Sequence, residues 1–175
     1  MTANGTYPID RIRQDFPILS ESVRGKPLVY LDNGASAQKP RAVIEQISKT
    51  YETEYANVHR GVHYMSQMAT DAMEAARVTA QTFLNAADEK EIIFVRGATE
   101  GINLVASSWG RANLKAGDEI ILSVLEHHSN IVPWQMIAEQ TGAVIKVVPI
   151  DDSGTFVVDE YGKLLCPNTQ LVSVT

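Results

Sequence analysis

The sequence predicts an α/β fold in which a mostly parallel sheet carries helices on both faces. Three observations support this prediction: short β-branched runs alternate with segments of helical periodicity, turn residues separate the two, and the connections are short. Consecutive parallel strands need a crossover connection, which is usually a helix. The alternation is therefore typical of a parallel sheet that is buried on both sides.

Each predicted element has a local reason in the sequence. The run Glu91-Ile92-Ile93-Phe94-Val95 has the β-branched and aromatic character of a buried strand, and Gly97 ends it. Gly142 stands where a glycine commonly ends a helix, and Ser66 could cap the start of another. In chain order, we expect a short helix within residues 10–16, strands at 28–31, 91–95, 120–124, 144–148 and 171–175, and helices over 40–55, 66–84, 102–109 and 131–140.

These elements divide the chain into two parts. Residues 1–27 are expected to form a polar N-terminal arm with its short helix, which Pro17 ends, and residues 28–175 one large domain. Open α/β sheets bind ligands beyond the carboxyl ends of their strands, and this sequence stops at such an end. We therefore expect 28–175 to be an incomplete large domain, cut at the end of a strand.

Composition argues against several classes of protein. With 45% apolar and 21% charged residues, the chain has a globular balance, and its net charge of −6 is spread over interspersed residues of both signs. No basic patch predicts a nucleic-acid or membrane partner, no apolar run could span a bilayer, and no secretory signal is visible. Cys166 is the only cysteine, which excludes an internal disulfide and favours a reducing, cytoplasmic compartment.

The turn Gly97-Ala98-Thr99-Glu100-Gly101 lies between a predicted buried strand and a predicted helix. The first N–H groups of a helix have no internal partners, and the helix dipole adds partial positive charge there. Gly97 and Ala98 would let a phosphate approach the backbone, and Thr99 supplies a hydroxyl donor. The alternative is an ordinary strand-to-helix connection with Thr99 as its N-cap.

The loop Glu126-His127-His128-Ser129-Asn130 follows the next predicted strand. His127 could stack on a planar cofactor or move protons near neutral pH. The alternative is a pair of surface histidines, one of which caps the following helix. No Cys/His pattern of known spacing joins these histidines to His59 and His63, so we expect no metal site.

The segment His59-Arg60-Gly61-Val62-His63 is the third candidate. Its two histidines would share a face if it were helical, but Gly61 favours a loop. A loop with His and Arg side chains could close over an anionic substrate. A solvated connector is the alternative.

Taken together, these segments resemble the class V aminotransferase-like cysteine desulfurases, in particular the SufS type. The block at 59–63 is the one that points to the SufS type, and the resemblance runs from about residue 10 to residue 175. The four blocks that carry it, in chain order, are 31–40, 59–63, 94–106 and 126–135.

The resemblance implies a pyridoxal 5′-phosphate (PLP) enzyme of fold-type I that works as a homodimer. It implies conversion of L-cysteine to L-alanine and an enzyme-bound persulfide, whose sulfur passes to an acceptor protein of iron–sulfur cluster assembly. It places Ala98 and Thr99 at the PLP phosphate and His127 over the pyridine ring, where it would assist catalysis. It places Ala35 and His59 near the substrate.

The sequence also departs from the family pattern. The family's Schiff-base lysine lies in a Ser-Gly-His-Lys stretch, which is absent here, and Cys166 does not stand where the family has its catalytic cysteine. We therefore expect this chain to be inactive alone and Cys166 to be structural. Ala98 replaces the threonine of many relatives, so the backbone must serve as donor there.

The sequence is also compatible with other functions. A selenocysteine lyase or related PLP β-lyase would share these blocks. A non-catalytic interaction module that binds a complete desulfurase or a sulfur carrier, or a non-functional fragment, would also carry them.

Overall fold

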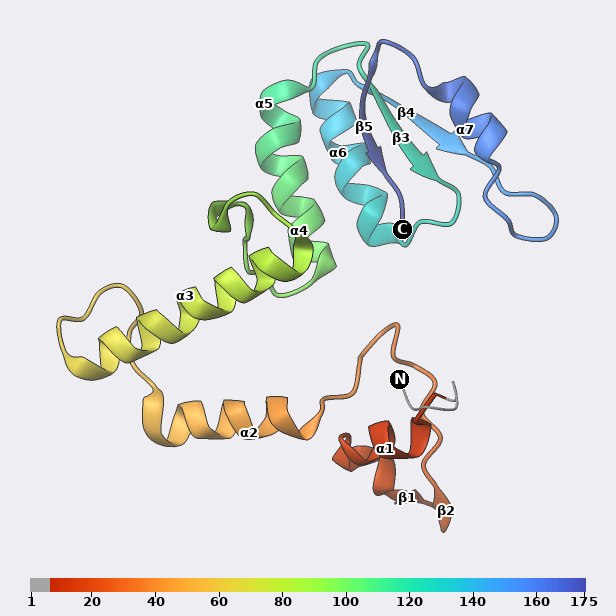
Figure 1. Cartoon of the computed structure of the whole chain (residues 1–175). Helices are drawn as coiled ribbons and strands as arrows, with labels where there is room; N and C mark the ends of the chain where they lie inside the picture. Colours follow the sequence, from red (N-terminus) through yellow and green to blue (C-terminus); the bar gives the residue numbers. More distant parts are fainter. Residues whose placement is uncertain (1–6) are drawn as a thin grey trace. The chain divides into compact units, whose positions relative to one another are not determined.

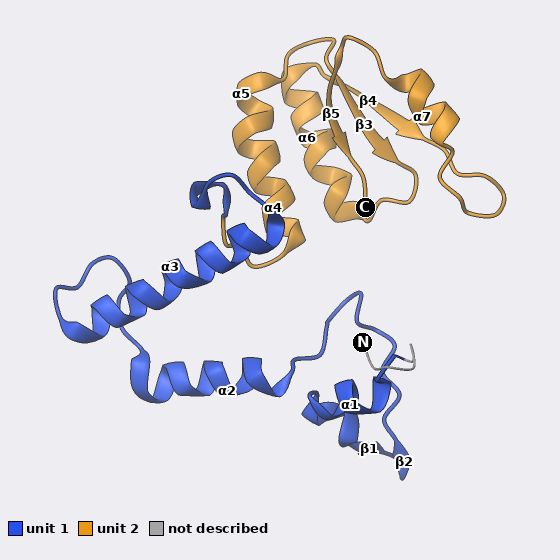
Figure 2. Cartoon of the chain, in the orientation of Figure 1, with its two compact units in different colours: residues 1–92 blue, residues 93–175 orange. Residues whose placement is uncertain are grey.

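The computed structural model describes residues 7–175, and these form two compact units (Figure 2). The first unit ends at Ile92 and the second comprises Ile93–Thr175. The predicted division into an arm over 1–27 and a large domain over 28–175 stays a prediction. Among residues 7–175, no helix combines the length and the apolar character that crossing a bilayer requires.

The first unit is mainly helical (Figure 1). Its two strands form a tight antiparallel hairpin, whose turn residues Arg24 and Gly25 both have positive φ, as such turns require. Pro40 directly precedes the second helix, and Asn85 ends the third in the left-handed conformation. The elements are α1 (Ile9–Gln14), η1 (Pro17–Ser20), β1 (Ser22–Val23), β2 (Lys26–Pro27), α2 (Arg41–Lys49), η2 (Thr50–Glu54), α3 (Tyr64–Leu84) and η3 (Glu89–Glu91).

The second unit contains a three-stranded parallel sheet of order β4-β3-β5 (Figure 1). Ile120 of the central strand pairs with Ile145 on one side and with Leu171 on the other. The elements are α4 (Ala98–Val105), η4 (Ala106–Gly110), α5 (Arg111–Asn113), β3 (Glu119–Ser123), η5 (His128–Asn130), α6 (Val132–Thr141), β4 (Val144–Val148), α7 (Val158–Leu164) and β5 (Thr169–Ser173).

The strand order explains why helices cover both faces of this sheet. From β3 the chain passes through α6 to β4 on one side, then through α7 back across the sheet to β5 on the other. Crossovers between parallel strands are right-handed, so reversing the direction of travel moves the connecting helix to the opposite face. The predicted α/β fold with a parallel sheet is confirmed.

One hydrophobic core lies between this sheet and its helices. Ile120 and Leu122 point from β3 towards Trp134 and Ile137 of α6, and all four are almost fully buried. Alternate residues of a strand face the same side, which is why 120 and 122 share this core. Burying each such side chain contributes about 1.5–3 kcal/mol, so β3 is the best-anchored strand of the unit.

Two predicted strands are wrong. Residues 28–31 and 91–95 belong to neither sheet: Glu91 ends η3, and Leu31 is 90% exposed. A strand is completed by hydrogen bonds to a neighbour, and the apolar character that suggested these strands does not supply one. The prediction that Ser66 caps a helix is also wrong: α3 begins at Tyr64, and His63 is its N-cap.

Candidate functional site

The turn at Gly97 forms the N-terminal end of α4. Gly97 is the N-cap residue and provides no side chain to accept from the first helical N–H groups. The Thr99 hydroxyl makes no hydrogen bond within residues 7–175, whereas its carbonyl accepts from Asn103 Nδ2 at 2.8 Å. An open hollow of about 510 Å³ lies here, lined by Arg96, Gly97, Thr99, Glu100 and Asn103. The alternative with Thr99 as N-cap is therefore wrong, because the helix starts one residue earlier.

Glu100 places a negative charge in the same hollow. Its carboxylate accepts from the Arg96 backbone N–H at 2.6 Å and from Arg96 Nε at 3.1 Å. The side-chain hydrogen bond from Arg96, followed by the backbone one, lowers the pKa of Glu100 below its usual value. Glu100 therefore stays ionised at neutral pH and holds the Arg96 guanidinium beside the turn.

A buried polar network closes the carboxyl end of β3. Glu126 accepts from Ser123 Oγ at 2.5 Å and from Asn130 Nδ2 at 2.7 Å. Asn130 also donates to the Ser173 carbonyl and accepts from Trp134 Nε1 at 2.9 Å and Ser173 Oγ at 2.6 Å. The network ties the loop after β3 to α6 and to β5.

Glu126 is a buried carboxylate that these donors keep ionised. Burial alone would raise the pKa of Glu126, but hydrogen bonds from Ser123, Asn130 and Thr175 outweigh it, so the pKa is lowered. Thr175 contributes both its N–H and its hydroxyl, at 3.2 and 3.0 Å. A buried charge is tolerated only when its lone pairs are occupied in this way.

This network presents His127 on the surface of the unit. His127 caps η5, and its Nδ1 accepts from the Ser129 N–H at 3.2 Å and lies 2.8 Å from Ser129 Oγ. A neutral ring that accepts at Nδ1 carries its proton on Nε2, so Nε2 is the donor that a ligand would meet. The rings of His127 and His128 lie 3.9 Å apart between centroids. The cap serves η5, and α6 itself has no side-chain cap.

Two of the three predicted segments lie on elements of the second unit that pack against each other. Helix α4, which starts at Ala98 and Thr99, packs against η5, the short helix that His127 caps. A helix N-terminus with free donors and an exposed imidazole are therefore carried by touching elements. The roles assigned to Ala98, Thr99 and His127 stay predictions.

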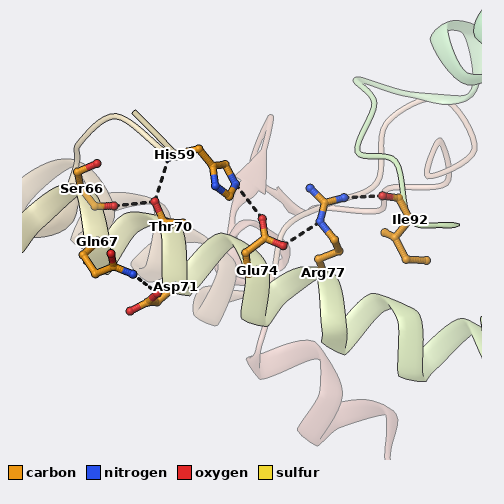
Figure 3. Close-up of polar contacts among 8 residues, drawn as sticks. All are labelled: His59, Ser66, Gln67, Thr70, Asp71, Glu74, Arg77 and Ile92. Atoms are coloured by element: carbon orange, nitrogen blue, oxygen red, sulfur yellow. Dashed lines mark hydrogen bonds and ion pairs between the residues drawn. The ribbon is translucent and has the colours of Figure 1, made fainter. Parts of the chain in front are cut away.

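The third segment lies in the first unit, where α3 holds it (Figure 3). Ser66, which is fully buried, donates through Oγ to the Asn57 carbonyl at 2.6 Å and accepts from the Gly61 N–H at 3.0 Å. A Cβ at Gly61 would lie 2.5 Å from Ser66 Oγ, so only glycine permits this approach. His59 has a φ of +63° and its N–H donates to Thr70 Oγ1 at 3.0 Å.

The remaining predicted residues have simpler surroundings. Ala35 is exposed in a turn, where its N–H donates to the Asp32 carbonyl at 3.2 Å. Cys166 is exposed, and its Sγ lies 3.4 Å from Glu119 Oε2. Among residues 7–175, no three His, Cys, Asp or Glu side chains converge as a metal site would require. The roles predicted for Ala35 and His59 stay predictions.

Comparison with known proteins identifies the family. Residues 29–175 match the aminotransferase class V family. The chain belongs to that family. The matched residues include the whole second unit, and with it the segments that α4 and η5 carry.

Relatives of this class V chain include curated cysteine desulfurases. It is 54% identical over 169 residues to the cysteine desulfurase of Synechococcus elongatus, and the aligned region covers 97% of this chain and 27% of that protein. It is 53% identical over 170 residues to the cysteine desulfurase of Klebsiella pneumoniae, covering 97% of this chain and 42% of that protein. The chain thus spans less than half the length of these relatives.

Solved structures agree with this assignment. The crystal structure of the cysteine desulfurase CsdA from Escherichia coli matches with a TM-score of 0.77 and 40% identity over 95% of this chain and 41% of that one. The apo cysteine desulfurase of Thermococcus onnurineus matches with a TM-score of 0.84 and 36% identity over 97% of this chain and 40% of that one. The α/β architecture predicted from the sequence is that of cysteine desulfurases.

Sequence reasoning missed the residues that support the site. The sequence pointed to Glu126 and Asn130 only as neighbours of His127, although a carboxylate three residues after a buried strand is itself a signal of a compensated charge. Glu74, whose Oε1 lies 2.9 Å from His59 Nε2, gave no signal, because it stands 15 positions away in the chain.

Proposed function

We propose that this chain is the cofactor-phosphate and ring-binding portion of a PLP-dependent cysteine desulfurase of the SufS type. The observation that carries the proposal is the packing of α4, with its free N-terminal donors, against η5 with His127. The curated relatives named above support the activity, and the His59-Arg60-Gly61-Val62-His63 block supports the type. L-cysteine is the proposed substrate.

The residues of the turn fit the phosphate of PLP. The first N–H groups of α4 have no intrahelical partner, Gly97 leaves the approach open, and the Thr99 hydroxyl is free to donate. A residue with a side chain at 97 would narrow this approach. Ala98 contributes only its backbone N–H.

His127 fits the place of a ring-stacking residue. Ser129 holds the His127 ring through Nδ1, and the hydrogen bond between Asn130 and Glu126 holds the loop that carries it. The ring is exposed, and its Nε2 proton is left for a ligand. PLP bound here would supply an electron sink for cleavage at an amino-acid substrate. His127 would orient the cofactor ring and hold a proton at Nε2.

The proposal extends to the complete protein. We propose that it works as a homodimer in the cytoplasm and that the sulfur taken from L-cysteine passes to an acceptor protein of iron–sulfur assembly. Sequence similarity to cysteine desulfurases supports these steps. The cysteine that accepts the sulfur is proposed to be other than Cys166, whose neighbours Glu119 and Thr169 are the first residues of β3 and β5.

Cofactor binding tests the site directly. The purified chain should bind PLP at least about tenfold more tightly than pyridoxal, which lacks the phosphate, because charge-assisted hydrogen bonds contribute about 1.5–3 kcal/mol each. Thr99→Ala should weaken PLP but not pyridoxal. Thr82→Ala, on an exposed face of α3, is the matched control. Equal affinity for both compounds would exclude the phosphate role.

A hybrid protein tests the activity. The chain alone should release no L-alanine from L-cysteine, because it contains no Ser-Gly-His-Lys stretch. Joined to the complementary part of the Klebsiella pneumoniae relative, it should release L-alanine, and His127→Ala should reduce the rate. A hybrid that folds and binds PLP but converts only selenocysteine would identify a selenocysteine lyase instead.

A further inference from the structure

Glu74 of α3 connects the ring of His59 to the guanidinium of Arg77 (Figure 3). Its Oε1 lies 2.9 Å from His59 Nε2, and its Oε2 accepts from Arg77 Nε at 3.2 Å. Arg77 donates in turn through Nη1 to the Ile92 carbonyl. The carboxylate therefore has one oxygen for the imidazole and the other for a guanidinium that is itself anchored to the backbone.

The contacts that hold the His59 loop form one polar stripe along α3. Ser66, Thr70 and Glu74 are spaced by four residues, so they share a face of the helix. Ser66 holds the loop at Asn57 and Gly61. Thr70 accepts from the His59 N–H, and Glu74 meets the His59 ring.

This stripe explains how His59 keeps an unfavourable backbone conformation. A side-chain-bearing residue at φ +63° persists where its surroundings over-determine it. Backbone and ring of His59 are both fixed from α3, one by Thr70 and the other by Glu74. These two contacts therefore restrict the orientation of the His59 side chain more than an exposed loop alone would.

The Glu74 contact also determines which nitrogen of His59 carries the proton. An ionised carboxylate only accepts, so the neutral imidazole places its hydrogen on Nε2. Nδ1 then bears a lone pair, and within residues 7–175 it has no hydrogen-bond partner. The His59 side chain is 54% exposed, so the ring is open to a ligand.

We propose that Glu74 is a positioning residue for His59: it locks the Nε2–H tautomer and presents Nδ1 as an acceptor for the ammonium or thiol group of an amino-acid substrate. The identity of the substrate rests on the proposed function. The locked ring does not, because it follows from contacts within the first unit.

Imidazole ¹⁵N NMR of the full 175-residue chain tests this assignment. In the wild type, the neutral ring of His59 should show a protonated Nε2 and an unprotonated Nδ1. Glu74→Ala should move the two resonances towards each other as the tautomers mix. Glu74→Gln, which retains one acceptor oxygen, should restore part of the separation. Asp71→Ala is the control, because Asp71 lies on the same helix but accepts from Gln67 instead.

Two outcomes test the positioning role of Glu74 and the substrate contact of His59 independently. Identical His59 resonances in wild type and Glu74→Ala, with α3 intact by circular dichroism, would overturn the positioning role. Addition of L-cysteine should shift the Nδ1 resonance in the wild type and in Asp71→Ala, and less in Glu74→Ala. If the tautomer is locked but L-cysteine does not shift the Nδ1 resonance, the positioning role of Glu74 stands and the proposed contact between Nδ1 and the substrate is overturned.

Discussion

Asn130 donates through Nδ2 to Glu126 Oε2 over 2.7 Å, and both side chains are buried. The Asn130 amide uses every bonding position it has: two donors to Glu126 and the Ser173 carbonyl, and two acceptor positions to Trp134 Nε1 and Ser173 Oγ. A fully used amide at this position joins three segments of the second unit. It also fixes the base of the loop that carries His127.

Asn130→Asp should strongly destabilise the second unit. The substitution keeps the shape but replaces an NH₂ donor with a carboxylate oxygen that faces Glu126. Leaving a buried charge without compensation costs about 3–5 kcal/mol. Denaturant unfolding should show this loss as a lower midpoint at unchanged slope. Asn113→Asp is the control, because Asn113 is exposed and should change stability by about 0.5 kcal/mol. An equal loss in the free energy of unfolding in the two variants would show that the Asn130 network does not stabilise the second unit in this way.

The parallel sheet was predictable because its signals are local. Ile120-Ile121-Leu122 and Val144 to Val148 are dense in β-branched residues and are bounded by turns, and both lie in the sheet. Gly142 ends α6, as the sequence predicted, and it does so in the left-handed conformation. Residues 28–31 and 91–95 carry similar signals without becoming strands, since pairing depends on a neighbour that local sequence does not specify.

The candidate site was predictable only in its outer features. Gly97, Thr99 and His127 follow strands or start helices, and their residue types signal chemistry by themselves. Glu126, Asn130 and Glu74 act through contacts that folding creates, such as the bond between Asn130 and Ser173 across 43 positions. Such partners have no fixed spacing in sequence, which is why motif reasoning missed them.

The ionised state of Glu126 should make stability depend on pH. Its folded-state pKa is lowered, so its contribution is complete above the unfolded pKa of about 4.3 and is lost as the pH falls through the folded value. Glu126→Gln imitates the protonated form. The free-energy difference between wild type and Glu126→Gln should therefore be constant near neutral pH and narrow below about pH 4.3. Glu100 and Asp151 also have lowered pKa values, but both remain in the variant and cancel in the difference. A difference that stays constant down to pH 3 would contradict a charged Glu126.

Glu100→Gln should tighten the binding of PLP by a few-fold at low salt. Glu100 lines the hollow at the start of α4, and its negative charge opposes a phosphate there. Because the carboxylate is exposed, the gain should shrink when the ionic strength is raised. Fluorescence titration with PLP at low and high salt measures both effects. Glu160→Gln, an exposed ion-pair partner of Lys163 on α7, should leave the affinity unchanged. Weaker binding by Glu100→Gln would mean that its hold on Arg96 matters more than its charge.

Two glycines have nearly the same backbone conformation but different surroundings, so substituting each by alanine separates the cost of backbone strain from the cost of packing. Gly142 and Gly154 have φ values of +79° and +84°. A Cβ at 154 would meet nothing within 4 Å, whereas one at 142 would lie 3.0 Å from Ala116 Cβ and 3.1 Å from Ala116 Cα. Gly154→Ala should therefore cost only the left-handed backbone penalty, about 1–2 kcal/mol. Gly142→Ala should add about 1–3 kcal/mol for displacing the Ala116 segment. Chemical unfolding of both variants measures the difference. Equal costs would show that the segment at Ala116 moves aside freely, and that α6 is joined to β3 less tightly than the contact between Gly142 and Ala116 implies.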